Sequence, residues 1–343
     1  MKKRTYIIGA IAILLLTSAA AFAYIAYQAV MAPTVQGQQT AYIQIYPNDN
    51  AQKVEEKITS TVDIKTMKAF SPLMEYYKYD NHVKPGNYAI RPGDSMRDIC
   101  LRLLSGNQTP VKLVIPSVRT LDRLAGAVAR QLMTDSTSIA HLLTDKSLID
   151  SLGYTLENFP SLFIPNTYEV YWTMTPQQFI ARMQKEHDRY WNDTRLAKAQ
   201  ALGLTPEEVS TLASIVDEET NKTDEKPLVA GLYLNRLKRG MLLQADPTVK
   251  FAHGKFELRR ILLAHLTIDS PYNTYKYAGL PPGPIRIPST SALESVLNPA
   301  QHNYLYMCAK EDFSGYHNFA TTLSQHNANA KRYQQELNRR KVK

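Results

Sequence analysis

Three consecutive acidic residues, Asp217, Glu218 and Glu219, close an apolar stretch that begins at Thr205. The stretch is typical of a helix, because Thr205 can cap it and Pro206 suits the first helical position. At about 100° per residue, Glu219 lies near the centre of the apolar face, whereas Asp217 and Glu218 lie well away from it. We therefore expect Glu219 to be the one carboxylate of the three that points toward the core.

Such a carboxyl group is suited to proton transfer, because three effects raise its pKa. Burial, the like charge of Asp217 and Glu218, and the negative end of the helix all disfavour the ionised form of Glu219. A carboxyl group that is still protonated near neutral pH can act as a general acid. The alternative is a structural carboxylate at a solvated helix end, bonded to a nearby arginine.

The loops that follow this helix carry side chains that could bind a saccharide. They are rich in Pro and Gly, and they also hold Tyr, Asn and Gln: residues 243–248, 271–275 and 279–285. Aromatic faces stack on sugar rings, and amides bond hydroxyl and N-acetyl groups, although each segment by itself is also typical of an ordinary loop. The side chains that we expect to converge on one cleft are Glu219, Gln244, Tyr272 and Asn273.

The N-terminus predicts a membrane anchor. Lys2, Lys3 and Arg4 precede an uncharged apolar run from Tyr6 to Tyr27, which is long enough to span a bilayer with the basic cluster in the cytoplasm. The alternative is a cleaved signal peptide, because residues 21–23 form an A-x-A site. We favour the anchor because the apolar run continues past that site. Both alternatives place the rest of the chain outside the cytoplasm.

Composition narrows the possible partners. The chain has 343 residues, a formal net charge of +9 and only two cysteines, Cys100 and Cys308. The positive charge suits an anionic polymer or a membrane surface, but there is no zinc spacing, aromatic RNA-binding run or long basic block that would predict nucleic-acid binding. The cysteines form neither a disulfide framework nor a paired metal motif, and we predict no metal and no cofactor.

The pattern of elements predicts an α+β protein in five parts. These are a cytoplasmic tail (1–5), a transmembrane helix (6–27), a linker (28–40), a small α+β module (41–110) and a catalytic domain (111–343). Strands at 41–46 and 87–90 and helices at 51–60, 64–79 and 92–104 lie in the module, and with the strand at 111–115 that follows it they give the order β-α-α-β-α-β. This layout resembles the LysM glycan-binding fold, and a plain spacer is the alternative.

Helices dominate the expected catalytic domain. We predict them at 120–132, 139–152, 176–191, 205–220, 224–239 and from 324 to the end, with strands at 304–309 and 317–320. Residues 162–168, which contain two aromatics and a proline, interrupt the helical pattern. We interpret them as a packed loop or as part of a substrate cleft.

In their order, these stretches resemble the endolytic murein transglycosylases, the MltG or YceG-like family. The resemblance rests on residues 212–220 (LASIVDEET), 235–237 (NRL), 243–248, 272–275, 279–285, His317-x-Phe319 and His326-Asn327, and earlier on 165–168 (PNTY). It covers nearly the whole chain. This sequence departs from the family pattern at Asp217-Glu218, where Glu-Lys is usual, and at Ala245 and Asn166.

The resemblance implies cleavage of the β-1,4 bond between N-acetylmuramic acid and N-acetylglucosamine, leaving a 1,6-anhydro end. Glu219 aligns with the family's catalytic acid, and Asp246 or the substrate N-acetyl group would stabilise C1. The implied binding residues are Gln244, Asp246, Thr248, Tyr272, Asn273, Tyr275, His317, His326 and Asn327. The implied partners are peptidoglycan strands, the cytoplasmic membrane and peptidoglycan synthases, with the catalytic domain on the extracytoplasmic side.

Two other functions compete with this interpretation. A metal hydrolase could use His253, His265, His317 and His326, but their spacing matches no H-x-x-x-H or H-E-x-x-H motif. A non-catalytic, membrane-anchored scaffold that binds the cell wall would keep the module and the basic C-terminal helix. It would not need Glu219 on the apolar face.

Overall fold

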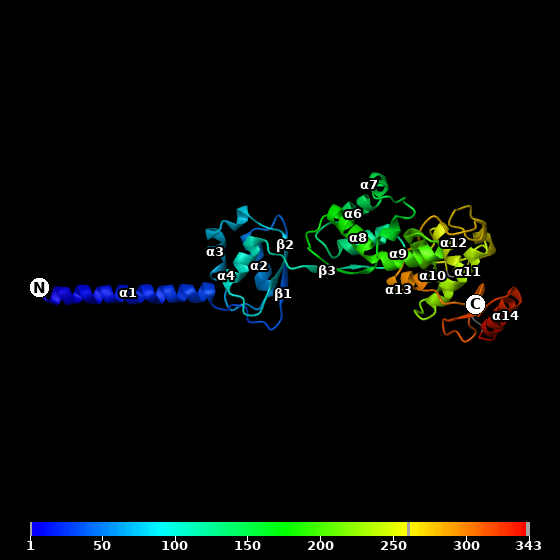
Figure 1. Ribbon diagram of the computed structural model, residues 1–343. Helices are drawn as coiled ribbons and strands as arrows, with labels where there is room; N and C mark the ends of the chain where they lie inside the picture. Colours follow the sequence, from blue (N-terminus) through cyan, green and yellow to red (C-terminus); the bar gives the residue numbers. More distant parts are fainter. Residues whose placement is uncertain (1, 259–260, 341–343) are drawn as a thin grey trace. The chain divides into compact units, whose positions relative to one another are not determined.

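The computed structural model describes residues 2–258 and 261–340. The chain forms two compact units, and each is described by itself (Figure 1). The first comprises the chain up to residue 112 together with residues 169–174, and the second comprises 113–168 and 175–343. The first division lies two residues beyond the expected boundary at 110. The return of residues 169–174 to the first unit is not evident from the sequence.

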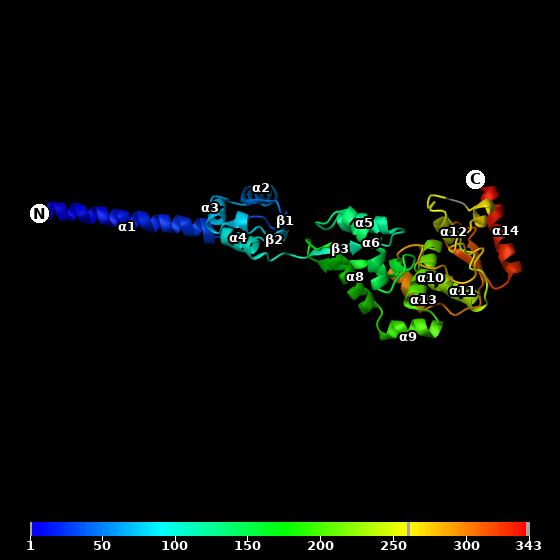
Figure 2. The same ribbon diagram turned by 90° about the horizontal axis from the view of Figure 1, so that it is seen from above.

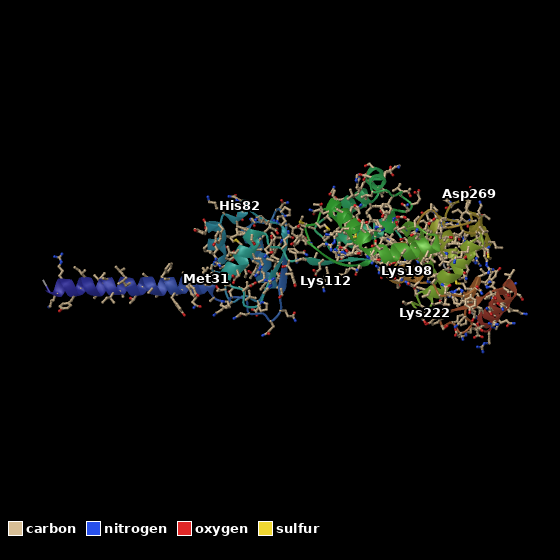
Figure 3. All side chains as sticks on the ribbon, viewed as in Figure 1. Met31, His82, Lys112, Lys198, Lys222 and Asp269 are labelled. Atoms are coloured by element: carbon tan, nitrogen blue, oxygen red, sulfur yellow. The ribbon has the colours of Figure 1, made fainter. Side chains whose placement is uncertain are left out.

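The N-terminal helix α1 (Lys2–Met31) is the one candidate membrane span among the described residues. Its segment Tyr6–Met31 has a mean hydropathy of 2.2 and no buried residues, and its side chains project on all sides (Figure 3). By length and composition this helix can cross a membrane, as an anchor or as a signal sequence. It continues four residues beyond Tyr27, and residues 34–36 then bond to the module that follows, because Gln36 N–H donates to the Asp63 carbonyl.

The module has the predicted order of elements and its own core. Strands β1 (Ala41–Ile45) and β2 (Gly86–Ile90) pair antiparallel, with Ile43 opposite Tyr88. The helices that cover this pair are α2 (Ala51–Thr61), α3 (Phe70–Tyr76), η1 (Tyr79–Asn81) and α4 (Met96–Ser105). Most of the apolar side chains of these elements, Val54, Phe70 and Ile99 among them, are buried in one cluster.

The prediction of one helix over 64–79 is wrong in its first part. Ile64 forms an isolated bridge with Val35, and Lys65 N–H donates to the Thr34 carbonyl. The backbone at Ile64 and Lys65 therefore pairs with the segment before β1, and α3 begins only at Phe70. The helical spacing of apolar residues is the same in both arrangements, so periodicity could not separate them.

The structure contains a second pair of strands. Strand β3 (Val111–Ile115) was predicted, and its partner β4 (Asn166–Val170) lies where we expected a loop. Tyr168 and Val170 are buried while their neighbours are exposed, which is the alternation of a strand with one covered face. The preceding residues form a short 3-10 helix, η2 (Phe159–Leu162).

The first part of the second unit is helical. It contains α5 (Leu121–Ala129), α6 (Ser136–Leu143), α7 (Lys146–Ser151), α8 (Pro176–Tyr190) and α9 (Asp193–Leu202). The single helix expected over 139–152 is two helices, because the Asp145 carboxylate accepts the N–H groups of Ser147 and Leu148 and so starts α7 afresh. Helix α9 was not predicted, because only one of its residues, Ala199, is buried.

The rest of the second unit surrounds helix α10 (Pro206–Glu219). The remaining elements are α11 (Lys226–Lys238), α12 (Asp246–Ala252), η3 (Leu263–Thr267), α13 (Thr290–Leu297), β5 (Tyr306–Ala309), β6 (His317–Ala320) and α14 (Leu323–Arg339). Both views place α11 and α13 beside α10 (Figures 1 and 2). Helices α10, α11 and α13 supply most of one large apolar core. The hairpin β5–β6 is antiparallel, with Ala309 opposite His317.

Candidate active site

Helix α10 begins as predicted and ends inside the domain. Thr205 and Glu208 form a capping box, and Pro206 occupies the first helical position. All residues from Val209 to Asp217 are buried, so the helix is covered on every side and not on one face alone. Glu219 is its last residue, and the extended Thr220 turns the chain away. The core therefore fixes the position of the helix end.

The Glu219 carboxyl group has the environment of a general acid. The Tyr233 hydroxyl donates a hydrogen bond of 2.7 Å to Glu219 Oε1. Burial raises the pKa of Glu219 to about 7, and the negative charge of Asp246 acts in the same direction. The Tyr233 hydrogen bond and the charges of His317 and Lys250 act against this rise in pKa. Near neutral pH, Glu219 can therefore both give and accept a proton.

Asp217 does not point away from the core as the sequence analysis expected. It is 7% exposed, and its Oδ1 lies 2.6 Å from Lys226 Nζ in a buried ion pair. The same carboxylate accepts the backbone N–H of Ser289 at 2.5 Å. The expectation failed because α13 and the start of α11 cover the side of α10 that the apolar pattern left polar. Asp217 thus fastens α10 to both helices.

Glu218 also has a structural environment that the sequence did not indicate. Its carboxylate accepts two hydrogen bonds from Arg119, at 2.8 and 2.6 Å, and one from Arg286 at 2.9 Å. The like charge that raises the pKa of Glu219 comes from Asp246, across the site, and not from its two paired neighbours. The structural alternative, a carboxylate bonded to arginine, therefore describes Glu218, whereas Glu219 is bonded to a tyrosine.

Glu219 lines a cavity of about 260 Å³ between α10, α11, the start of α12 and the β5–β6 hairpin. The wall is mostly polar. The side chains with hydrogen-bonding groups in this wall are Glu219, Tyr233, Arg236, Gln244, Asp246, Tyr275, Cys308 and His317. The structure thus brings Glu219 together with four of the predicted binding residues, Gln244, Asp246, Tyr275 and His317.

The residues from 244 to 246 reach the cavity through an unusual backbone. Gln244 has a φ of 52°, in the left-handed region that a residue with a side chain rarely adopts. Its backbone N–H donates to the Thr274 carbonyl at 3.1 Å, which ties it to the 271–275 loop. From that loop, the Tyr275 hydroxyl donates to Asp246 Oδ1 at 2.6 Å. The two loops therefore fix the Asp246 carboxylate at the cavity.

Five predicted binding residues lie outside this cavity, and three of them, Thr248, Tyr272 and Asn273, come from residues 243–275. Thr248 is fully buried and donates to the Ala245 carbonyl at 2.7 Å. Asn273 is also fully buried, and its side chain donates to the carbonyls of Leu266 and Ile268. Tyr272 packs on Phe251 and lines a different cavity. The structure thus uses Thr248 and Asn273 to shape the loops and does not bring Tyr272 to Glu219.

His326 and Asn327 lie on α14, and neither lines the cavity of Glu219. The His326 ring stacks on Tyr306 with centroids 5.5 Å apart, and burial lowers the pKa of His326. Tyr306 in turn packs under the guanidinium of Arg236, which does line the cavity. Asn327 is exposed. His326 therefore contacts Tyr306, which packs on a residue of the cavity wall, and does not itself face the cavity.

Comparison with known proteins identifies the family of the chain. The model of the YceG-like family matches residues 43–332, which is most of the sequence. This chain belongs to the YceG-like family. Two curated relatives are named endolytic murein transglycosylase: one from Bacillus subtilis, 29% identical over 79% of this chain and 78% of its own length, and one from Streptococcus pneumoniae strain D39, 32% identical over 68% of this chain. The match spans only 48% of the pneumococcal protein.

A solved structure agrees with the fold. The crystal structure of a YceG-like protein from Listeria monocytogenes is 26% identical in sequence and superimposes with a TM-score of 0.55. The match covers 85% of this chain and 99% of the Listeria chain. The described architecture is thus that of a YceG-like protein, with mixed α and β structure.

Several residues of this YceG-like site were not predicted. Tyr233, Arg236 and Cys308 line the cavity, Lys250 acts on Glu219 through its charge, and Glu225 bonds to His317. Arg236 lies in the NRL stretch that carries the family resemblance, and this was the one signal that could have singled it out. Tyr233 follows Glu219 by fourteen residues on another helix, so no local spacing connects the two.

The histidines considered for a metal site do not gather. His253 and His265 lie together, with rings 5.5 Å apart, but His317 bonds to Glu225 and His326 packs on Tyr306. Over residues 2–258 and 261–340, no three His, Cys, Asp or Glu side chains are placed to hold a metal ion.

Proposed function

We propose that this YceG-like protein is an endolytic peptidoglycan transglycosylase in which Glu219 acts first as the acid and then as the base. Membership in a family whose curated relatives are named endolytic murein transglycosylases indicates a lyase that acts on peptidoglycan. The observation that supports the role of Glu219 is its position in a polar cavity with a pKa raised to about 7. A carboxyl group in that range serves both proton transfers.

The proposed reaction needs no water. Protonated Glu219 gives its proton to the oxygen of the glycosidic bond, and the bond to C1 of N-acetylmuramic acid breaks with oxocarbenium character. The 6-hydroxyl of the same muramic residue attacks C1 and gives its proton to the Glu219 carboxylate. The products are a 1,6-anhydro end and a free 4-hydroxyl on N-acetylglucosamine, and Glu219 returns to its starting state.

The neighbours of Glu219 have distinct proposed roles. Tyr233 orients the carboxyl group through its hydrogen bond and stabilises the carboxylate that forms after the first proton transfer. Asp246, held by Tyr275, is the carboxylate that could face the positive charge at C1. The substrate N-acetyl oxygen could serve the same purpose. Gln244 supplies an exposed amide for hydroxyl or N-acetyl groups.

We also propose where the enzyme works. Helix α1, with Lys3 and Arg4 at its start, would hold the chain in the cytoplasmic membrane with both compact units outside. The module with β1 and β2 would bind glycan as LysM-like modules do. An anchored enzyme that cuts within strands is suited to release or terminate strands that are still being made at the membrane, beside the peptidoglycan synthases.

The decisive experiment compares the full chain with its Glu219→Gln variant on purified murein. Glutamine keeps the shape of the side chain and an acceptor for Tyr233, but it cannot donate a proton as an acid. General acid–base catalysis contributes about 10²–10⁴-fold, and one group does both halves here, so we expect a loss of roughly 10³-fold or more. Mass spectrometry should find anhydromuramic ends with the unsubstituted protein only.

The outcomes separate the rival functions. Retained murein binding with no anhydro ends from the unsubstituted protein would support the non-catalytic scaffold. Reducing ends in place of anhydro ends would indicate a hydrolase. Near-normal cleavage by the Glu219→Gln variant, with the same melting temperature, would remove Glu219 from the mechanism.

A further inference from the structure

A buried carboxylate, Glu225, bonds to His317 in the wall of the cavity that contains Glu219. It is 3% exposed, immediately before α11. Its Oε1 accepts the backbone N–H of His317 at 2.7 Å, and its Oε2 lies 2.9 Å from His317 Nδ1. Both oxygens of one buried carboxylate are therefore directed at one residue, and that residue lines the cavity of Glu219.

This pairing determines which edge of the imidazole ring meets the cavity. Because a carboxylate can only accept hydrogen bonds, Nδ1 carries the hydrogen atom in the bond to Glu225. Nε2 is then the ring nitrogen left for another partner, and the hydrogen bonds of the described residues give it none. The backbone of His317 is held as well, since it pairs with Ala309 in the β5–β6 hairpin. Backbone, ring orientation and tautomer are all constrained by the fold.

We propose that Glu225 is a positioning residue and that His317, through Nε2, hydrogen-bonds the saccharide beside Glu219. This proposal deepens the transglycosylase function and rests on it for the identity of the ligand. An imidazole that only filled space would not need a buried carboxylate on its far edge. His326 is such a case: its ring packs on Tyr306, and its Nδ1 is buried without a partner.

The charges around Glu219 agree with this placement. The groups that act on the Glu219 carboxyl group come from three elements: Tyr233 on α11, Asp246 and Lys250 on α12, and His317 on β6. Of these, His317 is the one that a buried carboxylate holds in place. When its ring is protonated on Nε2 as well, the positive charge of His317 lowers the pKa of Glu219 and so stabilises the carboxylate that forms when the glycosidic oxygen takes the proton.

The test uses the full chain in detergent and three variants. Glu225→Gln replaces one of the two acceptor oxygens by an amide donor, so the side chain can no longer accept from both N–H groups of His317. His317→Asn keeps a short amide donor for Glu225 but removes Nε2. Asp224→Asn is the matched control, because Asp224 is the neighbouring carboxylate, is exposed and accepts a bond from Tyr316. We expect kcat/KM for murein to fall about 10–100-fold in Glu225→Gln and about 100-fold in His317→Asn, and to stay within about twofold in the control.

The His317→Asn variant separates the functional role from a structural one. If His317 served only to satisfy Glu225, asparagine would largely replace it and cleavage would persist. Wild-type cleavage by His317→Asn would therefore overturn the proposal. Melting temperatures of all three variants show whether a loss of activity reflects unfolding. In His317→Asn, the backbone N–H and the side-chain amide of residue 317 can still donate to the two oxygens of Glu225.

A second measurement does not depend on cleavage. Histidine labelled with ¹⁵N in the imidazole ring reports the tautomer, and the signal that disappears in His317→Asn identifies His317. We expect a hydrogen on Nδ1 that is lost or redistributed in Glu225→Gln. In the Glu219→Gln background, an uncleaved murein tetrasaccharide should shift the Nε2 signal. An unchanged signal at saturating tetrasaccharide would contradict the contact, whereas a shift without anhydro ends from the unsubstituted protein would instead refute the transglycosylase function.

Discussion

Replacement of Tyr233 by phenylalanine should move the pH limit of activity upward. The Tyr233 hydroxyl donates to Glu219 Oε1 at 2.7 Å, and this bond lowers the pKa of Glu219 because it is stronger to the carboxylate than to the neutral acid. Hydrogen bonds to charged groups are worth about 1.5–3 kcal/mol and neutral ones about 0.5–1.5 kcal/mol. The difference is about 1–1.5 kcal/mol, which corresponds to roughly one pKa unit.

The direction of the change follows from the first proton transfer. Glu219 must be protonated in the free enzyme, so kcat/KM declines as the pH rises through the pKa of Glu219, about 7 in the native protein. In Tyr233→Phe that decline should come about one pH unit higher. The plateau of kcat at low pH should fall, because the carboxylate that forms on Glu219 has lost its donor and the acid is weaker.

The assay is a pH profile of murein cleavage for the native chain and the variant, with anhydromuramic ends as the measured product. Glu219→Gln gives the background rate at each pH. If the upper pH limit of cleavage stayed in place or moved to lower pH in Tyr233→Phe, the Tyr233 hydrogen bond would not be what lowers the pKa of Glu219. Loss of activity without any change of profile would mean that Tyr233 matters only for packing.

Two further predictions concern stability and topology. Asp217→Asn leaves Lys226 buried without its carboxylate, so the free energy of unfolding should fall by about 3 kcal/mol in chemical denaturation, while the pH limit of cleavage stays where it is. Unchanged stability would show that the pair is not needed. If α1 is a retained anchor, the mature protein should sediment with membranes and keep Met1 or Lys2 at its N-terminus, whereas a mature chain that starts at Tyr24 would show a cleaved signal peptide.

The helix that carries Glu219 could be predicted from the sequence because the information is local. Thr205, Pro206 and the apolar residues that follow define α10 without reference to the rest of the chain. The position of Glu219 at its end, the order of elements in the module and the β5–β6 hairpin are also encoded over short distances. Asp246, Tyr275 and His317 were assigned to the site through the family resemblance, whereas Gln244 was also expected from the residue types of its loop.

The partners of the three carboxylates could not be predicted, because they come from other elements and several of them lie far along the chain. Arg119 is 99 residues from Glu218, and Ser289 is 72 residues from Asp217. The pattern of one apolar helical face predicts that only one side of the helix is covered. Because α10 is buried on every side, its polar side chains also need partners inside the protein. The burial of Asn273 likewise depends on its neighbours, since a loop sequence does not tell whether an amide faces a ligand or its own backbone.

The return of residues 169–174 to the first unit has a consequence for dissecting the protein. Trp172 is 2% exposed and meets Tyr46 edge to face at 4.9 Å, and Thr173 exchanges hydrogen bonds with Gln108. A truncated chain that begins near residue 113 would keep this tryptophan but lose what covers it. Such a fragment would expose the apolar indole of Trp172 to solvent and should aggregate. The complementary fragment, which ends near residue 112, would lack residues 169–174 of the first unit. Because the first unit is discontinuous in sequence, no single cut separates two intact halves.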